Sequence, residues 1–431
     1  MNQQNSKALR SLTRRHFLKA ASITTGALAL GISNINAARR VKTLPKPQNS
    51  GIEHIIVVCM ENRSFDHFVG WIPGADGRQA GLSYSDETGA YPTYPLAPDY
   101  QGCGHPDPDH SYAGGRVEYN GGLCDGWLRA GENDLYSIGY YTQNDLPFYA
   151  GAANRWTSCD RYFAPILAGT YPNRFYLNAA QTDRLDNTLN LSTLPTIWDR
   201  LAAKSLPAKY YFSDVPFLAL WGLKHASVLA PVAEFFADCA AGNLPAVSYV
   251  DPRLLGEQEG LSNDDHPHAD VRNGQVFLNE IYNAVVNSPN WPNTVLVITY
   301  DEWGGFFDHV APQRAQIPPA TAAAGDTDGL RGFRVPTFII SPWSSAEVSH
   351  DVFDHTSILN MIEWRWHIEP LTVRDATANN LAMALDFSKR NLSAPAFAVP
   401  DGTFGLPCPL TQLAPNDWDE LASIASNLGL I

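Results

Sequence analysis

The sequence lacks the features of several large protein classes. It holds 30 Lys and Arg against 44 Asp and Glu, a formal net charge of −14 with no basic stripe, which argues against nucleic acid as a partner. No apolar run reaches the roughly 18 residues of a membrane-spanning helix, so no transmembrane segment is expected in the mature protein. No CxxC pair is present, which argues against thiolate-bound zinc. What remains is an acidic chain whose 45% hydrophobic residues are ample for a buried core.

The N-terminus has the pattern of an export signal. Arg14 and Arg15, followed by Phe-Leu-Lys, precede a weakly apolar stretch at residues 20–32. This pattern resembles a twin-arginine signal, and cleavage after Ala37 would remove residues 1–37. The alternative is an N-terminal amphipathic helix. The signal predicts a periplasmic or secreted protein whose partner during export is the twin-arginine machinery.

The remaining chain is predicted to form a linker and one domain. Residues 38–50 are basic and then proline-rich, which is typical of a linker, and residues 51–431 are predicted to be a single domain with long loops. The six cysteines fit an oxidising compartment. Cys103 and Cys124 flank a loop rich in Gly, Pro and His, and they are the preferred disulfide.

Apolar, β-branched segments of strand length alternate with amphipathic helix patterns. The predicted strands are residues 54–60, 208–212, 244–250, 294–300 and 334–340. One helix is predicted to start near residue 172. The other predicted helices span residues 193–204, 269–287, 354–366 and 416–428. This order predicts an α/β fold, with a doubly wound, mostly parallel sheet sandwiched by helices.

Two of the predicted buried strands end in oxygen-bearing side chains. Glu61 and Asn62 follow the first, and Asp301 and Glu302 follow the strand at 294–300. Open α/β sheets place their chemistry at the carboxyl ends of strands, and four hard oxygen ligands suit Ca²⁺, Mg²⁺ or Mn²⁺. The alternative for Glu61 and Asn62 is that they cap the next helix.

Thr170 and two histidines are candidates for the chemistry itself. Thr170 lies at or next to the N-cap of a predicted helix, beside free backbone N–H groups that attract anions. A metal at its hydroxyl would make it a nucleophile, although an ordinary cap is the more common role. His110 and His266 lie in polar loops and are able to donate to a phosphate or protonate a leaving group; solvated or core histidines are the alternative.

Five motifs together resemble a known family. They read ENRSFDHFVG at 61–70, TYPNR at 170–174, HPHADVRNGQVFLNEIY at 266–282, DEWGGFFDHVAP at 301–312 and RGFRVPTFIISPW at 331–343. In this order they resemble the phosphoesterase family of bacterial and plant non-specific phospholipases C and related acid phosphatases. The resemblance covers residues 52 to 366 and implies the alkaline-phosphatase-like fold.

The resemblance also implies roles for individual residues. One divalent metal ion, with Ca²⁺ preferred over Mg²⁺ or Mn²⁺, would be bound by Glu61, Asn62, Thr170, Asp301 and Glu302. Thr170 would also be the nucleophile, Asn173 would face a phosphate oxygen, and His110 and His266 would be the active-site histidines. Support or helix capping is expected, rather than catalysis, for Asp308, His309, Asp354 and His355. His268 is out of step with the family pattern and is left out of the site.

Three functions follow as alternatives. The first is a metal-dependent phospholipase C that releases a phosphorylated head group through a phospho-enzyme on Thr170. The second is a broad acid phosphatase, which is favoured by the expectation that residues 367–431 are only a proline-containing tail with one short helix. The third is a non-catalytic metal- or phosphate-binding periplasmic protein, against which the intact nucleophile and ligand positions argue.

Overall fold

A mixed sheet lies at the centre of the structure. The computed structural model describes residues 43–409 and 417–431, and the chain divides into the units Met1–Lys42 and Thr43–Ile431. The predicted export signal lies outside the described residues. The sheet consists, in spatial order, of β13 (Val348–Ser349), β6 (Thr157–Cys159), β12 (Phe338–Ile340), β11 (Thr294–Tyr300), β1 (His54–Met60), β10 (Val247–Val250), β8 (Ala208–Phe212) and β9 (Leu229–Pro231).

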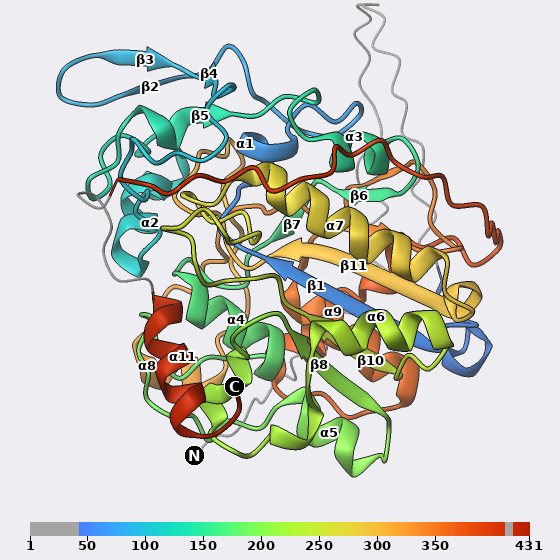
Figure 1. The fold of residues 1–431 in the computed structure, drawn as a ribbon. Helices are drawn as coiled ribbons and strands as arrows, with labels where there is room; N and C mark the ends of the chain where they lie inside the picture. The colour runs from blue at the N-terminus through green and yellow to red at the C-terminus, as the bar shows by residue number, and fades with distance from the viewer. Residues whose placement is uncertain (1–42, 410–416) are drawn as a thin grey trace, which may run out of the picture. The chain divides into compact units, whose positions relative to one another are not determined.

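Strands β1 and β11 form the middle of this sheet and lie side by side in Figure 1. They pair in parallel from His54 opposite Thr294 to Met60 opposite Tyr300, and nearly every side chain of both is buried. β-branched residues buried on both faces explain why these two strands were predicted with their observed bounds. Because they are parallel and in register, their carboxyl ends meet at one edge of the sheet.

The strand predicted at 334–340 is shorter and runs the other way. Only Phe338–Ile340 pairs with the sheet, antiparallel to β11. Pro336 has no N–H to donate to the ladder, which explains why pairing begins after it. The strand at 208–212 is confirmed, and the strand predicted at 244–250 begins at Val247.

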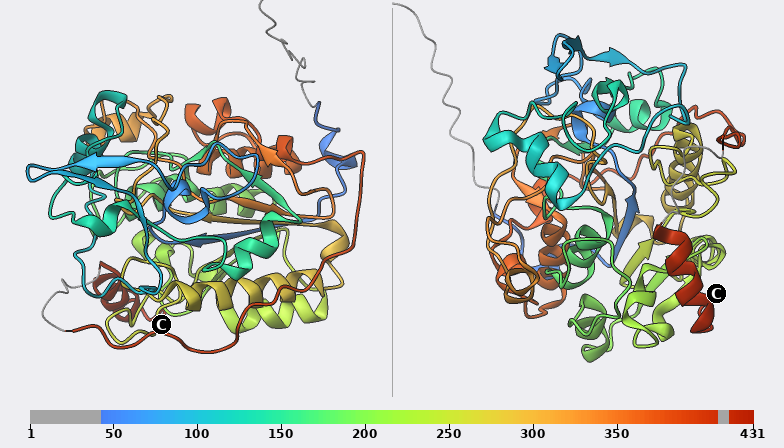
Figure 2. Two further views of the ribbon diagram at one scale, coloured as in Figure 1. Left: turned by 90° about the horizontal axis from the view of Figure 1, so that it is seen from above. Right: turned by 90° about the vertical axis from the view of Figure 1, so that its left-hand side faces the viewer.

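Helices cover both faces of the sheet. Seen from above, the sheet runs between the yellow-green α6 and yellow α7 on one side and the orange α9 on the other (Figure 2). Helix α4 packs against α9. The helices are α1 (Phe65–Val69), α2 (Tyr112–Tyr119), α3 (Pro147–Ala153), α4 (Thr170–Ala179), α5 (Ile197–Ala203), α6 (Val232–Ala241), α7 (Val271–Val286), α8 (Pro319–Ala324), α9 (His355–Trp366), α10 (Val373–Thr377) and α11 (Asp417–Asn427). The predicted α/β sandwich is therefore confirmed.

The segments predicted as linker and tail contain more structure than expected. The short 3₁₀ helix η1 (Pro47–Asn49) falls within the predicted linker and packs against α9. After α9, the tail forms α10 and a 3₁₀ turn at Leu381–Ala384 in addition to α11. None of the helices in the described ranges combines the length and apolar character needed to cross a bilayer.

The disulfide prediction was wrong. Cys103 bonds to Cys408, 305 residues away, with a Cα–Cα distance of 5.3 Å. Cys124 is instead a buried thiol in a small apolar cluster with Trp127. Because the two cysteines are so far apart in the sequence, their spacing gives no signal that they pair. The bond ties the C-terminal segment to the loop at residues 99–105.

We expect Cys103→Ser to lower the free energy of unfolding by about 2–4 kcal/mol, because the unfolded chain loses a long-range crosslink. Cys408→Ser should cost the same, and the double variant should cost no more than either single one. Cys124→Ser removes no crosslink and is the control. Peptide mapping without reduction should recover Cys103 joined to Cys408; recovery of Cys103 joined to Cys124 would contradict the structure.

Candidate active site

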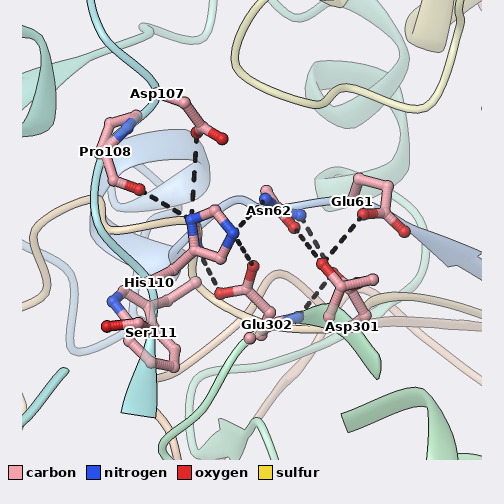
Figure 3. Close-up of polar contacts among 12 residues, drawn as sticks. Glu61, Asn62, Asp107, Pro108, His110, Ser111, Asp301 and Glu302 are labelled. Atoms are coloured by element: carbon pink, nitrogen blue, oxygen red, sulfur yellow. Dashed lines mark hydrogen bonds and ion pairs between the residues drawn. The ribbon is translucent and has the colours of Figure 1, made fainter. Parts of the chain in front are cut away.

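The carboxyl ends of β1 and β11 bring four predicted ligands together. Glu61, Asn62, Asp301 and Glu302 are completely buried. Asp301 Oδ1 accepts a hydrogen bond from the Asn62 backbone N–H at 3.1 Å and one from the Glu302 N–H at 2.7 Å. Figure 3 shows these side chains converging from the two strand ends. The parallel register of the strands therefore produces the cluster that the sequence predicted.

Backbone geometry that few residues tolerate shapes this corner. Asn62 has a left-handed φ of 56°, which turns its amide away from the line of the strand. Gly304 has φ of 64°, and a Cβ there would lie 2.2 Å from the Asn62 carbonyl oxygen. Glycine is thus required at 304 for the two strand-end loops to approach each other.

Helix α4 presents Thr170 to the cluster. The helix begins at Thr170 itself, with Gly169 as its N-cap, and the Thr170 side chain is nearly buried. Thr170 Oγ1 lies 3.4 Å from both Glu61 Oε2 and Asn62 Oδ1. The hydroxyl therefore stands at a helix N-terminus and among the predicted metal ligands at the same time.

Arg174, one turn further along α4, is the cation of the cluster. Its Nε donates to Glu61 Oε1 at 2.9 Å and lies 3.5 Å from Asp301 Oδ2, and its Nη1 donates to Asp251 Oδ1 at 3.1 Å. Burial, and then the neighbouring Asp301, raise the pKa of Glu61 and of Glu302 well above the usual range. One guanidinium does not compensate the negative charge that the fold places here.

Several buried oxygens of the cluster have no hydrogen-bond partner among the described residues. These atoms are Asp301 Oδ2, Glu302 Oε1 and the neighbouring Asp264 Oδ2. Burial, and then Glu257, raise the pKa of Asp264 well above its usual value. Carboxylate oxygens that accept no hydrogen bond in a buried site are the donors that a hard divalent cation binds, so the residues present fit such an ion.

The two histidines lie beside the cluster and share an acid. His110 Nε2 lies 3.4 Å from Asn62 Nδ2 and 3.9 Å from Glu302 Oε1, while its Nδ1 is 2.7 Å from the Pro108 carbonyl (Figure 3). The Asp107 carboxylate is 3.6 Å from His266 Nε2 and 4.0 Å from His110 Nδ1. Asp107 therefore bridges the two imidazoles.

The surroundings of His266 favour its protonated form. Its Nδ1 lies 2.5 Å from Glu257 Oε1. Burial lowers the pKa of His266, but Glu257 and then Asp107 outweigh it and raise the pKa well above its usual value. An imidazolium directed by a carboxylate is suited to donate a proton.

The side chain of Asn173 makes hydrogen bonds to the backbone. Its Oδ1 accepts from the Ile166 N–H at 3.1 Å, and its Nδ2 donates to the carbonyls of Ala168 and Gly169 at 2.6 and 3.0 Å. The amide is completely buried and fully used by the loop before α4. It therefore fixes the turn that carries Thr170, and a contact between Asn173 and phosphate stays a prediction.

Of the four residues expected to give support, Asp354 and His355 lie at the start of α9. Asp354 is the N-cap of α9 and pairs with Arg331 and Arg374, and His355 Nε2 lies 2.9 Å from the Asp301 carbonyl. Capping is thus observed for Asp354, and His355 contacts the backbone of a candidate ligand.

Asp308 and His309 form a second acidic group with Asp66, with ligand atoms within 4.8 Å of one another. Arg334 already supplies a cation there, at 3.0 Å from both Asp66 Oδ1 and Asp308 Oδ1. The group is able to offer ligands to a metal, but its charge is compensated by the protein. The strand-end cluster, in which several buried oxygens accept no hydrogen bond from the described residues, is the better candidate for an ion.

Several residues of the site were missed from the sequence: Arg174, Asp107, Glu257 and Asp264. Arg174 had a usable signal, because a residue four positions after Thr170 on a helix lies on the same face. The three acids lie in loops, where no periodic pattern in the sequence indicates which way a side chain points. Tertiary contact alone reveals them.

A cavity of about 320 Å³ lies beside the site, and His110 and Gly169 are among its lining residues. Residues 107–111, including His110, line one side, and Gly169 lies next to the candidate nucleophile. The rest of the lining comes from residues 185–187 and from Asp417. Its acidic side chains are Asp107, Asp109, Asp186 and Asp417, so the entrance has negative potential.

The part of the chain that resembles known proteins contains the site residues described above. The phosphoesterase family matches this chain over residues 52–369, which includes every strand-end ligand, Thr170 and both histidines. The chain belongs to the phosphoesterase family. This phosphoesterase is accordingly a hydrolase of phosphoric ester bonds, as the motifs implied.

Two relatives show how far the similarity extends. The phosphoesterase is 31% identical over 370 residues to non-specific phospholipase C1 of Arabidopsis thaliana, covering 76% of this chain and 69% of that protein. It is also 31% identical over 475 aligned residues to phospholipase C B of Mycobacterium tuberculosis, covering 89% and 88% of the two chains.

Solved structures resemble the phosphoesterase more distantly. A phosphonate monoester hydrolase of Agrobacterium radiobacter matches with a TM-score of 0.40 at 11% identity, covering 78% of this chain and 77% of that one. An alkaline phosphatase superfamily protein of Vibrio parahaemolyticus matches with a TM-score of 0.37 at 10% identity, covering 88% and 86%. The family assignment rests on the sequence match.

We expect Arg174→Met to destabilise the metal-free protein by about 3–5 kcal/mol, because Glu61, Asp251 and Asp301 lose their buried counter-charge. Adding Glu61→Gln to this variant should recover part of the loss. Arg129→Met is the control, since Arg129 pairs with Asp125 on the surface and should cost less than about 1 kcal/mol. Equal losses for the two arginines in denaturant unfolding would show that Arg174 does not balance the cluster.

Proposed function

We propose that this protein is a metal-dependent phospholipase C that uses Thr170 as its nucleophile and forms a phospho-enzyme intermediate. The observation that carries the proposal is the position of Thr170 Oγ1, 3.4 Å from two ligand oxygens at the end of β1 and at the first residue of a helix. Relatives named phospholipase C support the choice of reaction.

One divalent ion, Ca²⁺ in this proposal, would be held by Glu61, Asn62, Thr170, Asp301 and Glu302. Their oxygens form a hard donor set, and two of the carboxylates have an oxygen that accepts no hydrogen bond from the described part of the chain. When bound, the ion would lower the pKa of the Thr170 hydroxyl and polarise the phosphate.

In the first step, Thr170 Oγ1 attacks phosphorus in line while the bond to the leaving alkoxide breaks. The hydroxyl proton passes to Glu61 Oε2, which lies 3.4 Å away. His266, protonated beside Glu257, gives its proton to the alkoxide, which leaves as the alcohol. The partial positive charge at the N-terminal end of α4 stabilises the negative oxygens of the transition state.

In the second step, water attacks the phosphorus of the phospho-enzyme. His266, now neutral, takes the proton of the water, and the bond between Thr170 and phosphorus breaks. Thr170 recovers its proton from Glu61, so both groups return to their starting states. His110 is positioned to donate a hydrogen bond to a phosphate oxygen near Glu302 and Asn62.

The acidic entrance favours a diester over a monoester. A phosphomonoester carries close to two negative charges at neutral pH, whereas a diester carries one. Four aspartates around the cavity repel the more highly charged substrate. This electrostatic difference supports the phospholipase C reaction over an acid phosphatase.

Export by the twin-arginine pathway, to the periplasm or beyond, is the proposed localisation. The Arg14–Arg15 pattern and the observed Cys103–Cys408 disulfide support it, since disulfides persist in oxidising compartments.

We expect Thr170→Val to lower kcat on p-nitrophenyl phosphorylcholine at least about a thousandfold, because it keeps the shape of the side chain but removes the nucleophilic oxygen. Thr170→Ser retains a hydroxyl and should recover much of the activity. Steady-state rates on this diester and on p-nitrophenyl phosphate are compared side by side. Substantial turnover by Thr170→Val would rule out the nucleophile, faster hydrolysis of the monoester would identify an acid phosphatase, and inactivity on both with metal bound would favour a binding protein.

We expect the effect of His266→Gln to depend on the leaving group. Hydrolysis of phosphatidylcholine, whose alkoxide needs a proton, should slow about a hundredfold or more, while p-nitrophenyl phosphorylcholine, whose phenolate leaves unaided, should slow far less. His350→Gln, at a largely exposed histidine, is the control. An equal loss on both substrates would contradict the role of His266 as general acid.

A further inference from the structure

The C-terminal helix α11 packs beside the helix that carries Thr170. In Figure 1 it is the red helix near α4. Trp418, Leu421 and Ala425 form its buried face, which packs on the 3₁₀ helix η4 (Phe217–Trp221). Asp417, the first residue of α11, lines the same cavity as His110 and Gly169. The helix thus forms part of the wall of the active-site cavity.

A chain of hydrogen bonds joins α11 to the first turn of α4. Asp417 Oδ2 accepts from Asn187 Nδ2 at 2.6 Å. Asn187 Oδ1 in turn accepts from the backbone N–H of Tyr171 at 2.8 Å, next to Thr170. The Tyr171 hydroxyl donates to the Asp417 carbonyl at 2.8 Å and closes the loop. Asn187 therefore acts as a cap on the α4 N-terminus, and Asp417 orients that cap.

A second contact reaches the metal-binding side of the site. The Arg174 guanidinium lies 5.0 Å from the ring centroid of Trp418, within the range of a cation–π interaction. The Trp418 ring also packs against Tyr171 at 5.7 Å. Because Arg174 pairs with Glu61 and Asp301, α11 contacts both the nucleophile turn and the arginine that balances the ligands.

We propose that α11 is a positioning element of the active site, in which Asp417, acting through Asn187, fixes the α4 turn that holds Thr170. This inference rests on the proposed function, since it gives Thr170 a catalytic task. It assigns a role to a helix 247 residues after Thr170, outside the family match at 52–369. Asp417 and Asn187 are positioning residues, because they act through the Tyr171 backbone.

The first test is hydrogen exchange, which does not depend on activity. In the full-length protein, Asp417→Ala should speed exchange of the amides at the start of α4 about fivefold or more, because the Asn187 cap loses its orientation. Asp417→Asn should not, since its amide oxygen accepts the same hydrogen bond. Glu420→Ala, which removes another exposed carboxylate from the first turn of α11, is the matched control.

The second test uses the same variants in steady-state kinetics with p-nitrophenyl phosphorylcholine. Asp417→Ala should lower kcat about tenfold with KM changed less than about twofold, and Asp417→Asn should stay close to wild type. Leu421→Ala, at a buried position of the same helix, measures how far a loss of stability alone lowers kcat.

The proposal would be overturned if Asp417→Ala had the same amide exchange rates and the same kcat as Glu420→Ala. It would also be overturned if Asp417→Ala exchanged faster at the start of α4 but kept the wild-type kcat. A kcat loss that tracks melting temperature equally in Asp417→Ala and Leu421→Ala would also overturn it. If the wild-type protein hydrolyses neither substrate, the proposed function fails, and the exchange experiment still decides whether α11 orders the turn.

Discussion

The structure depends on keeping several carboxylates buried at one edge of its sheet. Glu61, Asp301 and Glu302 are completely buried, with Asp264 next to them, and Arg174 is the cation that contacts Glu61 and Asp301. Burying charge without compensation costs several kcal/mol per group. The raised pKa values of Glu61, Glu302 and Asp264 express this cost, chiefly as desolvation. A bound divalent ion would relieve it, which links the stability of the fold to its chemistry.

Three features of the fold bring the residues of this cluster together. Parallel pairing of β1 with β11 puts two carboxyl ends side by side, and Gly304 lets the following loops touch. Helix α4 then brings Thr170 and Arg174 from one face of a single turn. The four strand-end ligands directly follow two paired, buried strands, and Thr170 begins a helix, which suits a site that must hold oxygens in fixed directions.

The sequence predicted the central strands, the family and the cluster of candidate residues because each has a local signal. Two β-branched runs ending in oxygen-bearing residues indicated both the strands and the residues at their ends. The disulfide of Cys103, the shortened β12 and the amide of Asn173 were not predictable in this way. Each is decided by contacts between distant segments, as is the orientation of Glu257 toward His266.

The central claim is that the strand-end cluster binds one divalent ion. The most direct test is metal analysis of the purified protein after equilibration with Ca²⁺ and removal of free ion. The account predicts one equivalent in the wild type, a large loss in Glu302→Gln, and no loss in Asp308→Asn, whose group is compensated by Arg334. A wild-type protein that retains no divalent ion and keeps full phosphodiesterase activity in chelator would contradict it.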